Sequence, residues 1–532
     1  MINQKPCAVQ KIETSQGFSI LYKEHYLYSK YNPSKNIITT VEKLQLLPGT
    51  IILCCSPLLG YGISELLNKL PENCLIVLCE AETALYDFSD QQGCLNFSDK
   101  RILKCRPEKL LDLPLTLYDL ARSSLYKRLI RIDLSAGTQF HKDFYDQLFA
   151  ASTDSVMTFW KNRITLAKFG RRYSKNLFEN LHYLAESKAI TDYFQAVEKP
   201  IIVFGAGEST QTFLNKYKDS ISNCFVLCAD TALQPLLKNG IKADGVFVEE
   251  AQSLIVKAFT GIPDDIHIFA GLSSIPNLVH KYGAKNLSYF FTEYTQADFL
   301  DNLKSKNFMP PANKPFGSVG LTAVYYALKF RKDDSIPVYV TGLDFSYSTG
   351  VTHTKGALAH LLRLITTNRI QSIKNYAAAF GTATEKFTDK SGKTFITTPS
   401  LKNYANMFNS FFSDEKNLFD AGESGIPLKI PQAIPQVFYS KEQIISNSTY
   451  TEKQKTEIKE YLENERQSLE YLRDLLTGKT SFTGEELTKQ IIEFAEHREY
   501  LYLHFPDGWR FSTNQSFLNR IRTEIDFFLK YL

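Results

Sequence analysis

The chain has 532 residues, of which 44% are hydrophobic and 22% charged, and its net charge is +4. This composition is typical of a globular protein with about three domains, and so small a net charge gives no support for a nucleic-acid-binding surface. The first residues, MINQKPCAVQKIETS, lack the apolar core of a signal peptide, and no stretch reaches the roughly 20 apolar residues of a membrane span. We therefore expect a cytoplasmic protein without a membrane span. Nine scattered cysteines without a C-x-x-C pair predict buried free thiols rather than a zinc site.

Residues 1–135 are predicted to form a small Rossmann-like α/β domain. Short strands are expected within 17–40, and the run TIILCC at 50–55 reads as a buried strand followed by a glycine-containing turn and a helix. The next strand, CLIVLCE, ends at Glu80, about 20 residues after the turn, as in a nucleotide-binding βαβ unit. The glycine pattern is incomplete, so the alternative is a domain of this kind that has lost its cofactor.

The rest of the chain divides into three predicted parts. Residues 136–197 have helical spacing and are expected to form a connector. Residues 198–435 alternate buried strands with helices, which predicts a doubly wound, mainly parallel sheet with its ligands at the carboxyl ends of the strands. Residues 436–532 are charged and amphipathic, which is typical of a helical bundle.

Five loops at strand ends of the central part are candidates for chemistry. The first, GAGEST, follows the strand IIVF and opens a helix whose free N–H groups suit a phosphate, although the third glycine of a dinucleotide loop is replaced by Thr210. The second, CADTALQPLLKNGIKADGVFVEE, has carboxylates at strand ends that suit ribose hydroxyls or a metal, or that only cap helices and turns. The third, FGSVG, is a small-residue turn at a helix start.

The fourth loop, GLDFSYSTGVTHTKG, presents His353 in polar surroundings, where a histidine suits general acid or base work near neutral pH. The fifth, FDAGESG, either closes one side of a pocket or is an ordinary turn. For every loop the alternative is a plain structural turn.

The order of these motifs, FGAGEST, CADTALQPLLKNGIKADGVFVEE, KPFGSVGLTA, VTGLDFSYSTGVTHTKG and NLFDAGESGIPLKI, resembles the bacterial motility accessory factors. These are flagellin glycosyltransferases whose central domain is shared with the archaeal 6-hydroxymethylpterin diphosphokinase-like family. The resemblance covers about residues 198–435. The chain departs from the family pattern at Glu208, where a proline is usual, and in the turn from Asp420 to Gly425.

The resemblance implies transfer of a nonulosonic acid, a sialic-acid-like sugar, from a CMP-activated donor to Ser or Thr hydroxyls of flagellin. It implies no metal and no tightly bound cofactor. Under it, His353 takes the acceptor proton, and Tyr347 or Lys355 supports the leaving phosphate. The residues predicted to be catalytic are His353, Asp344 and Tyr347. The residues predicted to bind the nucleotide or donor are Gly205, Ala206, Gly207, Glu208, Ser209, Asp230, Thr231, Glu249, Gly317, Ser318, Val319, Gly342, Thr354, Lys355 and Glu423.

Two further functions stay open at this point. A pterin-alcohol diphosphokinase would need ATP and Mg²⁺, with Asp230, Asp244, Glu249 or Asp344 holding the metal. A non-catalytic flagellar assembly or binding protein on a decayed enzyme fold is the third possibility, since fold alone does not define function.

Overall fold

The computed structural model describes residues 8–349, 351–370, 383–436 and 450–532, and the chain forms two compact units, Met1–Lys168 and Phe169–Leu532. The division falls within α5, a helix of 43 residues (Lys142–Leu184). Each unit is described separately. The predicted boundaries near residues 135, 197 and 435 divide the chain more finely and stay predictions.

The first unit contains a four-stranded parallel sheet with strand order β6-β5-β4-β7. Its strands are β4 (Thr50–Cys55), β5 (Leu75–Cys79), β6 (Ile102–Cys105) and β7 (Arg128–Asp133). Its helices before α5 are α1 (Lys35–Lys43), α2 (Ile63–Lys69), α3 (Thr83–Gln91) and α4 (Leu113–Ser124). Every residue of β4 is buried, as expected for a strand with a packed layer on each face.

A small antiparallel sheet precedes these elements and consists of β1 (Gln10–Thr14), β2 (Gly17–Tyr22) and β3 (His25–Tyr26). Strands were predicted as far as residue 40, but α1 begins at Lys35. The segment KNIITTVEK is rich in β-branched residues, yet the packing of Ile37 and Val41 into the core beside the sheet decides in favour of helix.

The second unit is built on a nine-stranded sheet with main strand order β14-β13-β12-β11-β10-β9-β15-β18, and β8 pairs with β13. All its neighbouring strands are parallel. The strands are β8 (Lys188–Ala189), β9 (Ile201–Phe204), β10 (Phe225–Ala229), β11 (Gly245–Val248), β12 (His267–Gly271), β13 (Leu287–Thr292), β14 (Ala312–Asn313), β15 (Val338–Thr341) and β18 (Leu418–Asp420). The predicted doubly wound parallel sheet is confirmed.

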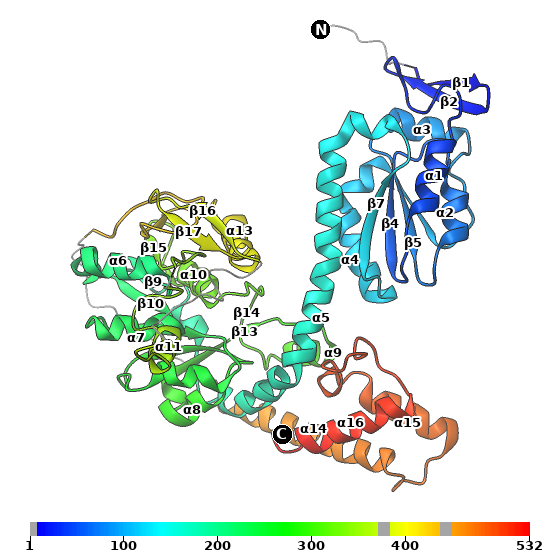
Figure 1. The fold of residues 1–532 in the computed structure, drawn as a ribbon. Helices are drawn as coiled ribbons and strands as arrows, with labels where there is room; N and C mark the ends of the chain where they lie inside the picture. Colours follow the sequence, from blue (N-terminus) through cyan, green and yellow to red (C-terminus); the bar gives the residue numbers. More distant parts are fainter. Residues whose placement is uncertain (1–7, 350, 371–382, 437–449) are drawn as a thin grey trace. The chain divides into compact units, whose positions relative to one another are not determined.

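Helices cover both faces of this sheet (Figure 1). On one face α10 (Val319–Phe330) and α13 (Pro399–Phe412) pack with Val203 of β9 in one hydrophobic core. On the other face α6 (Glu208–Tyr217) and α7 (Asp230–Lys238) follow β9 and β10, and Phe204 contacts Phe213 edge to face. The remaining helices around the sheet are α8 (Asn277–Tyr282), α9 (Asp298–Ser305) and α11 (Leu358–Ile365), and β16 (Glu385–Thr388) and β17 (Thr394–Thr397) form a hairpin.

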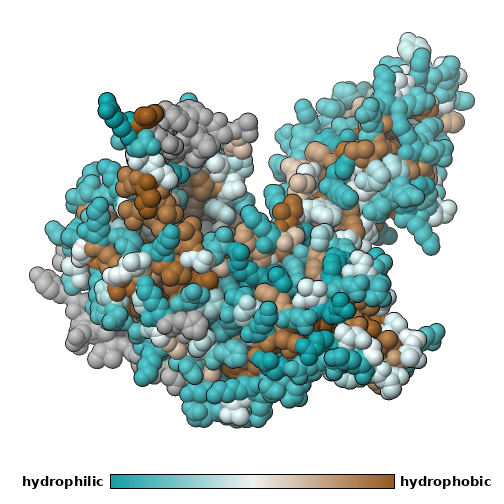
Figure 2. All heavy atoms as spheres, turned by 60° about the horizontal axis from the view of Figure 1, so that its bottom comes forward, coloured by the Kyte–Doolittle hydropathy of each residue, from teal (hydrophilic) through white to brown (hydrophobic). Residues whose placement is uncertain are grey.

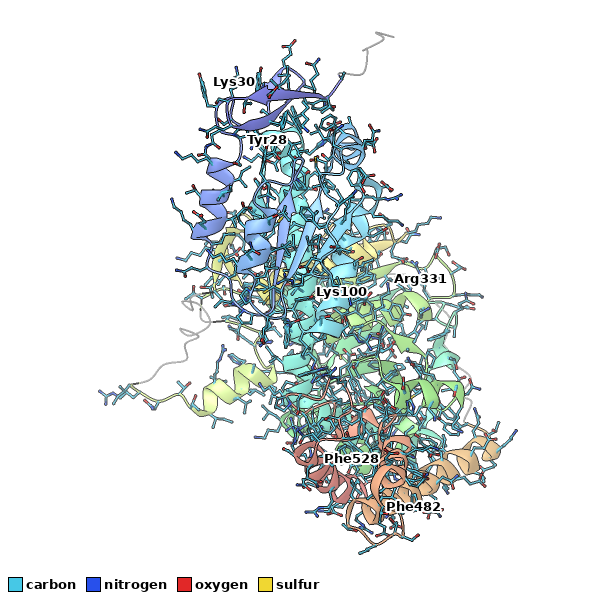
Figure 3. The ribbon with its side chains drawn as sticks, turned by 90° about the vertical axis from the view of Figure 1, so that its right-hand side faces the viewer. Tyr28, Lys30, Lys100, Arg331, Phe482 and Phe528 are labelled. Carbon is cyan, nitrogen blue, oxygen red and sulfur yellow. The ribbon has the colours of Figure 1, made fainter. Side chains whose placement is uncertain are left out.

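The C-terminal part of the second unit is helical, as predicted, and is drawn in orange to red in Figure 1. It contains α14 (Glu452–Leu476), α15 (Gly484–Ala495) and α16 (Gln515–Phe528). A capping box at Thr451 starts α14. Phe528, labelled in Figure 3, packs against Phe178 of α5 and Tyr500, so the end of α5 belongs to the core of this bundle.

Most of the face drawn in Figure 2 is hydrophilic, with apolar side chains gathered in a few small areas. One apolar element in contact with solvent is α11, which buries none of its side chains and stands out from the second unit in Figure 3. Among the described residues, no helix combines the length and apolar character needed to cross a membrane. The eight cysteines of the described part are free thiols, and Cys7 lies outside it.

Candidate active site at the switch point of the second sheet

The strand order of the large sheet locates the candidate site. From β9 the chain proceeds strand by strand to β14 on one side, and then returns to place β15 on the other side of β9. In an open parallel sheet a ligand binds at the carboxyl edge beside such a reversal. The loops that start at Gly205 and Gly342 meet at this point, since β9 and β15 are adjacent and end in register.

A buried carboxylate joins these two loops. Asp344 is 3% exposed and accepts hydrogen bonds from the backbone N–H of Ser209, with N and Oδ2 2.7 Å apart, and from the Ser209 hydroxyl. The same hydroxyl oxygen accepts a hydrogen bond from the backbone N of Gly342 at 2.9 Å. Burial raises the pKa of Asp344 to about 6, although the bonds from Ser209 and the charge of Lys390 oppose that rise. Asp344 therefore joins the loop pair, with both of its carboxylate oxygens bonded to Ser209.

The glycines of the two loops are required by their close approach. A Cβ on Gly205 would lie 2.3 Å from the carbonyl oxygen of Gly342, and a Cβ on Gly342 would lie 2.3 Å from that of Gly205. Gly342 also has a φ of 74°, in the left-handed region that favours glycine. Loop-to-loop packing thus accounts for these glycines.

The N-terminus of α6 is largely used by the protein itself. The N–H of Gly205 donates to the carbonyl of Thr341 at 2.8 Å, and that of Gly207 donates to the carbonyl of Gly342 at 2.9 Å. The N–H of Ser209 is bonded to Asp344, which supplies the negative charge that a helix N-terminus favours. Phosphate binding across Gly205–Ser209 was predicted, but these three N–H groups are already bonded.

The start of α10 offers a less occupied helix N-terminus at the same edge. Ser318 is its N-cap and makes no capping bond with its side chain. The turn reaches the loop after β15, since a Cβ on Gly320 would lie 2.4 Å from Cδ2 of Leu343. Gly317 has a φ of 68°, and its position lies against the ring of Tyr404. The predicted group Gly317, Ser318 and Val319 therefore lies beside the loop pair.

His353 and Thr354 lie on the same loop as Asp344. The backbone N of Thr354 donates to the carbonyl of Ala206 at 2.8 Å, which holds the histidine segment against the first glycine loop. Burial and, secondarily, the charge of Arg363 lower the pKa of His353, which favours the neutral imidazole. Its Nδ1 lies 3.2 Å from the Thr352 hydroxyl. A neutral, partly buried imidazole at a strand-end loop has the properties of a general base.

Asp230 and Glu249 follow β10 and β11 at the same edge. Asp230 is 4% exposed, and burial, with the nearby charges of Glu250 and Glu249, raises its pKa to about 7. The carboxylate of Glu249 accepts hydrogen bonds from the hydroxyls of Thr292 and, at 2.9 Å, of Thr322. Thr231 donates its backbone N–H to Asp230.

Asp244 instead precedes β11 and accepts from the N–H of Val226, which places it at the opposite edge of the sheet. No group of three or more acidic, His or Cys residues in the described ranges is arranged to hold a metal ion.

Three predicted residues have other surroundings. Glu423 is bound by Lys216 at 2.5 Å and by the Tyr217 hydroxyl at 3.0 Å, at the far end of α6 from the glycine loop. Tyr347 is 5% exposed, exchanges backbone hydrogen bonds with Ile396 and packs in a small apolar cluster. Lys355 is exposed.

Polar atoms without a partner gather at this switch point. Ten buried side-chain oxygen or nitrogen atoms of the described residues make no hydrogen bond, and four of them belong to the loops after β9 and β15 or to the end of β15. These four are Glu208 Oε2, Thr341 Oγ1, Ser346 Oγ and Thr354 Oγ1. Native proteins pair nearly all such groups, so a cluster of exceptions indicates a place for a ligand or for ordered water.

The first unit has a switch point of its own, between β4 and β7, but its polar groups are paired. Glu80, 1% exposed, accepts from the Ser56 hydroxyl at 2.6 Å and from the Glu82 N–H at 2.9 Å. Tyr28, which Figure 3 labels near the small β1–β3 sheet, donates to the Pro57 carbonyl at 3.1 Å and accepts from the N–H of Leu59. The Tyr28 hydroxyl thus bonds to two backbone groups of the loop that follows β4.

Sequence reasoning missed the residues near Asp389 that contact the segment from Asp420 to Ile426. Lys390 forms an ion pair with Asp420, and Asp389 accepts the N–H of Gly425 at 3.1 Å, while the N–H of Ile426 donates to the carbonyl of Asp344. The segment DKSGK after β16 carries the composition of a turn, which is a structural signal and not a functional one.

Comparisons with known proteins agree with this architecture. Residues 172–350 match the family described as 6-hydroxymethylpterin diphosphokinase MptE-like. A solved structure, the MAf glycosyltransferase from Magnetospirillum magneticum AMB-1, is similar over 99% of this chain and 91% of its own, with a TM-score of 0.52 and 12% identity. The class is thus a protein with an MptE-like domain and the fold of that glycosyltransferase, as the resemblance predicted.

An uncharacterized protein of Treponema pallidum (strain Nichols) is 30% identical over 556 aligned residues, which cover 98% of this chain and 94% of that protein. The chain belongs to the same family as this treponemal protein.

Proposed function

We propose that the protein is a glycosyltransferase that moves a nonulosonic acid from a CMP-activated donor to Ser or Thr hydroxyls of flagellin in the cytoplasm. The observation that carries the proposal is the position of His353: its loop is bonded to the first glycine loop at the switch point of a sheet that shares the fold of a glycosyltransferase. A neutral imidazole there suits removal of the acceptor proton.

The binding sites for the donor's phosphate and ribose are assigned to other groups at the same edge of the sheet. The donor phosphate is assigned to the N-terminus of α10 at Ser318 and Val319, where backbone N–H groups stabilise the charge that develops on leaving CMP. The ribose is assigned to Asp230, which ends the second strand of the βαβ unit. No tightly bound cofactor is needed for this reaction.

The test is transfer by a His353→Ala variant. Purified protein is incubated with flagellin and a CMP-activated nonulosonic acid, and the intact mass of flagellin is followed. We expect His353→Ala to slow transfer at least ~100-fold, the usual contribution of a general base, with the Kd for CMP changed by less than about twofold. His360→Ala, on α11 of the same segment, is the matched control. Transfer by His353→Ala at the wild-type rate would show that the base is another group.

The family match to residues 172–350 favours a second candidate, a diphosphokinase that uses ATP and Mg²⁺. Of its predicted metal ligands, Asp244 lies at the opposite sheet edge and Asp344 is bonded to Ser209, which leaves Asp230 with Glu249. Calorimetric titration with ATP–Mg²⁺ and with CMP separates the two functions. Binding of CMP without any transfer would instead support the non-catalytic binding protein.

A further inference from the structure

Two unpaired polar groups lie on the segments that the Thr354–Ala206 hydrogen bond holds together. Thr354 is 1% exposed, its backbone N–H is bonded to Ala206, and its hydroxyl has no partner in the described part of the chain. Glu208, two residues after Ala206, begins α6, and its Oε2 atom is buried without a partner. A carboxylate oxygen and a hydroxyl therefore remain unpaired on two segments that a backbone hydrogen bond joins.

The chemistry of this pair selects the kind of group that it binds. An ionised carboxylate only accepts hydrogen bonds, whereas a threonine hydroxyl both donates and accepts. A phosphate has no donor for Glu208 and would be repelled by its charge, and Asp344 already supplies the negative charge at the start of α6. Two adjacent hydroxyls match the pair: one donates to the carboxylate, and the other exchanges a bond with the threonine.

We propose that Glu208 and Thr354 form a diol-recognition site, next to His353, that binds the vicinal hydroxyls of the substrate. The proposal rests on the proposed function only where it assigns the two hydroxyls to the transferred sugar. The ribose of the nucleotide also carries two adjacent hydroxyls and could bind in the same way.

The first arm of the test needs no ligand. Thr354→Val keeps the side-chain shape and removes a buried hydroxyl that has no partner, so we expect the thermal midpoint of the ligand-free protein to stay the same or to rise. A lower midpoint would mean that the hydroxyl is bonded within the protein, and this would overturn the proposal whatever the protein binds.

The second arm compares wild type with Glu208→Gln by calorimetric titration. The probes are CMP, 2′-deoxy-CMP, CMP-activated N-acetylneuraminic acid, ATP–Mg²⁺ and inorganic phosphate, and Glu186→Gln, an exposed glutamate of the same unit, is the control. A loss of roughly tenfold or more for the activated sugar alone assigns the diol to the sugar, because a bond to a charged group is lost. An equal loss for CMP but not for 2′-deoxy-CMP assigns it to the ribose.

The remaining outcomes separate this proposal from the proposed function. Equal binding of every probe by wild type and Glu208→Gln, or tighter binding of phosphate and CMP by the variant, would overturn the diol site. If the wild type binds ATP–Mg²⁺ but no cytidine compound and Glu208→Gln weakens that binding, the diol site stands and the transferase proposal fails.

Discussion

Asp344 is the residue on which the loop geometry depends most directly. It lies 135 positions after Ser209 in the chain, and its two oxygens hold the N–H and the hydroxyl of that serine. Phe345, which follows it, has a φ of 49°, a left-handed conformation that is unusual for an aromatic residue and is often found beside functional sites. Asp344 therefore joins the first glycine loop to the histidine loop through its carboxylate, and its backbone carbonyl accepts the N–H of Ile426.

The raised pKa of Asp344 predicts how stability depends on pH. The carboxyl of the unfolded chain has its ordinary pKa of about 3.8 and the folded one has a pKa of about 6, so the folded state holds the proton more tightly. The stabilisation is complete below pH 4 and is lost as the pH rises through 6, by at most about 3 kcal/mol. We expect Asp344→Asn to lack this loss, so its thermal midpoint improves relative to wild type between pH 4 and pH 7.

Asp389→Asn is the control with the opposite sign. The pKa of Asp389 is lowered, despite partial burial, by hydrogen bonds from Ser391, Lys393 and Gly425. Its contribution is therefore present above the unfolded pKa and is lost as the pH falls through the lowered folded pKa, so the deficit of this variant has its full size at neutral pH and shrinks in acid. Parallel curves for wild type and Asp344→Asn would contradict the account of Asp344.

At the residue scale, the sequence predicted which loops form the candidate site but not the hydrogen bonds that join them. The motifs around Ser209 and Asp344 were recognised because they follow apolar strands. Their pairing depends on β15 lying beside β9, and strand order is set by tertiary packing that one sequence does not reveal. For the same reason Glu423 was assigned to the donor, whereas it binds Lys216.

Among the elements, the buried parallel strands were the easiest to predict. β10 and β11 are short runs of apolar residues between turns, as expected for strands that are buried on both faces of a parallel sheet. Only tertiary contacts define α1, where β-branched residues suggested a strand. The loops that leave β9 and β15 pack against each other where Gly205 meets Gly342.

A Gly342→Ala variant tests how tightly the loops after β9 and β15 are packed, and Gly261→Ala is its matched control. Both have positive φ, 74° and 68°, so an alanine at either position causes the same backbone strain, about 1 kcal/mol. A Cβ at Gly342 would also lie 2.1 Å from Oγ1 of Thr210, whereas nothing lies within 4 Å of one at Gly261. We expect Gly342→Ala to lower the free energy of unfolding by at least about 1 kcal/mol more than Gly261→Ala, measured by denaturant titration. Equal effects would mean that the loops separate readily.

At the scale of the whole molecule, the chain contains two parallel sheets with a switch point each, and they differ in how fully their polar groups are paired. In the first unit Glu80 is satisfied and Tyr28 covers the loop after β4. At the switch point of the second unit, four buried polar atoms have no partner in the described residues. The same topology thus yields one closed edge and one edge that suits a ligand.

A Tyr28→Phe variant tests which of the two switch points binds the nucleotide. The variant loses the bonds to Pro57 and Leu59, so we expect the first unit to lose about 1–2 kcal/mol of stability. The Kd for CMP should stay within about twofold of wild type, because the proposed site is in the second unit. Loss of CMP binding in the folded variant would place the nucleotide at the first switch point.

The most direct test of the central claim is a crystal structure of the protein with CMP. We predict that CMP lies at the carboxyl edge of β9 and β15, with its phosphate at Ser318 and its ribose at Asp230. CMP bound beside Glu80 in the first unit, or at a surface away from both glycine loops, would contradict the account.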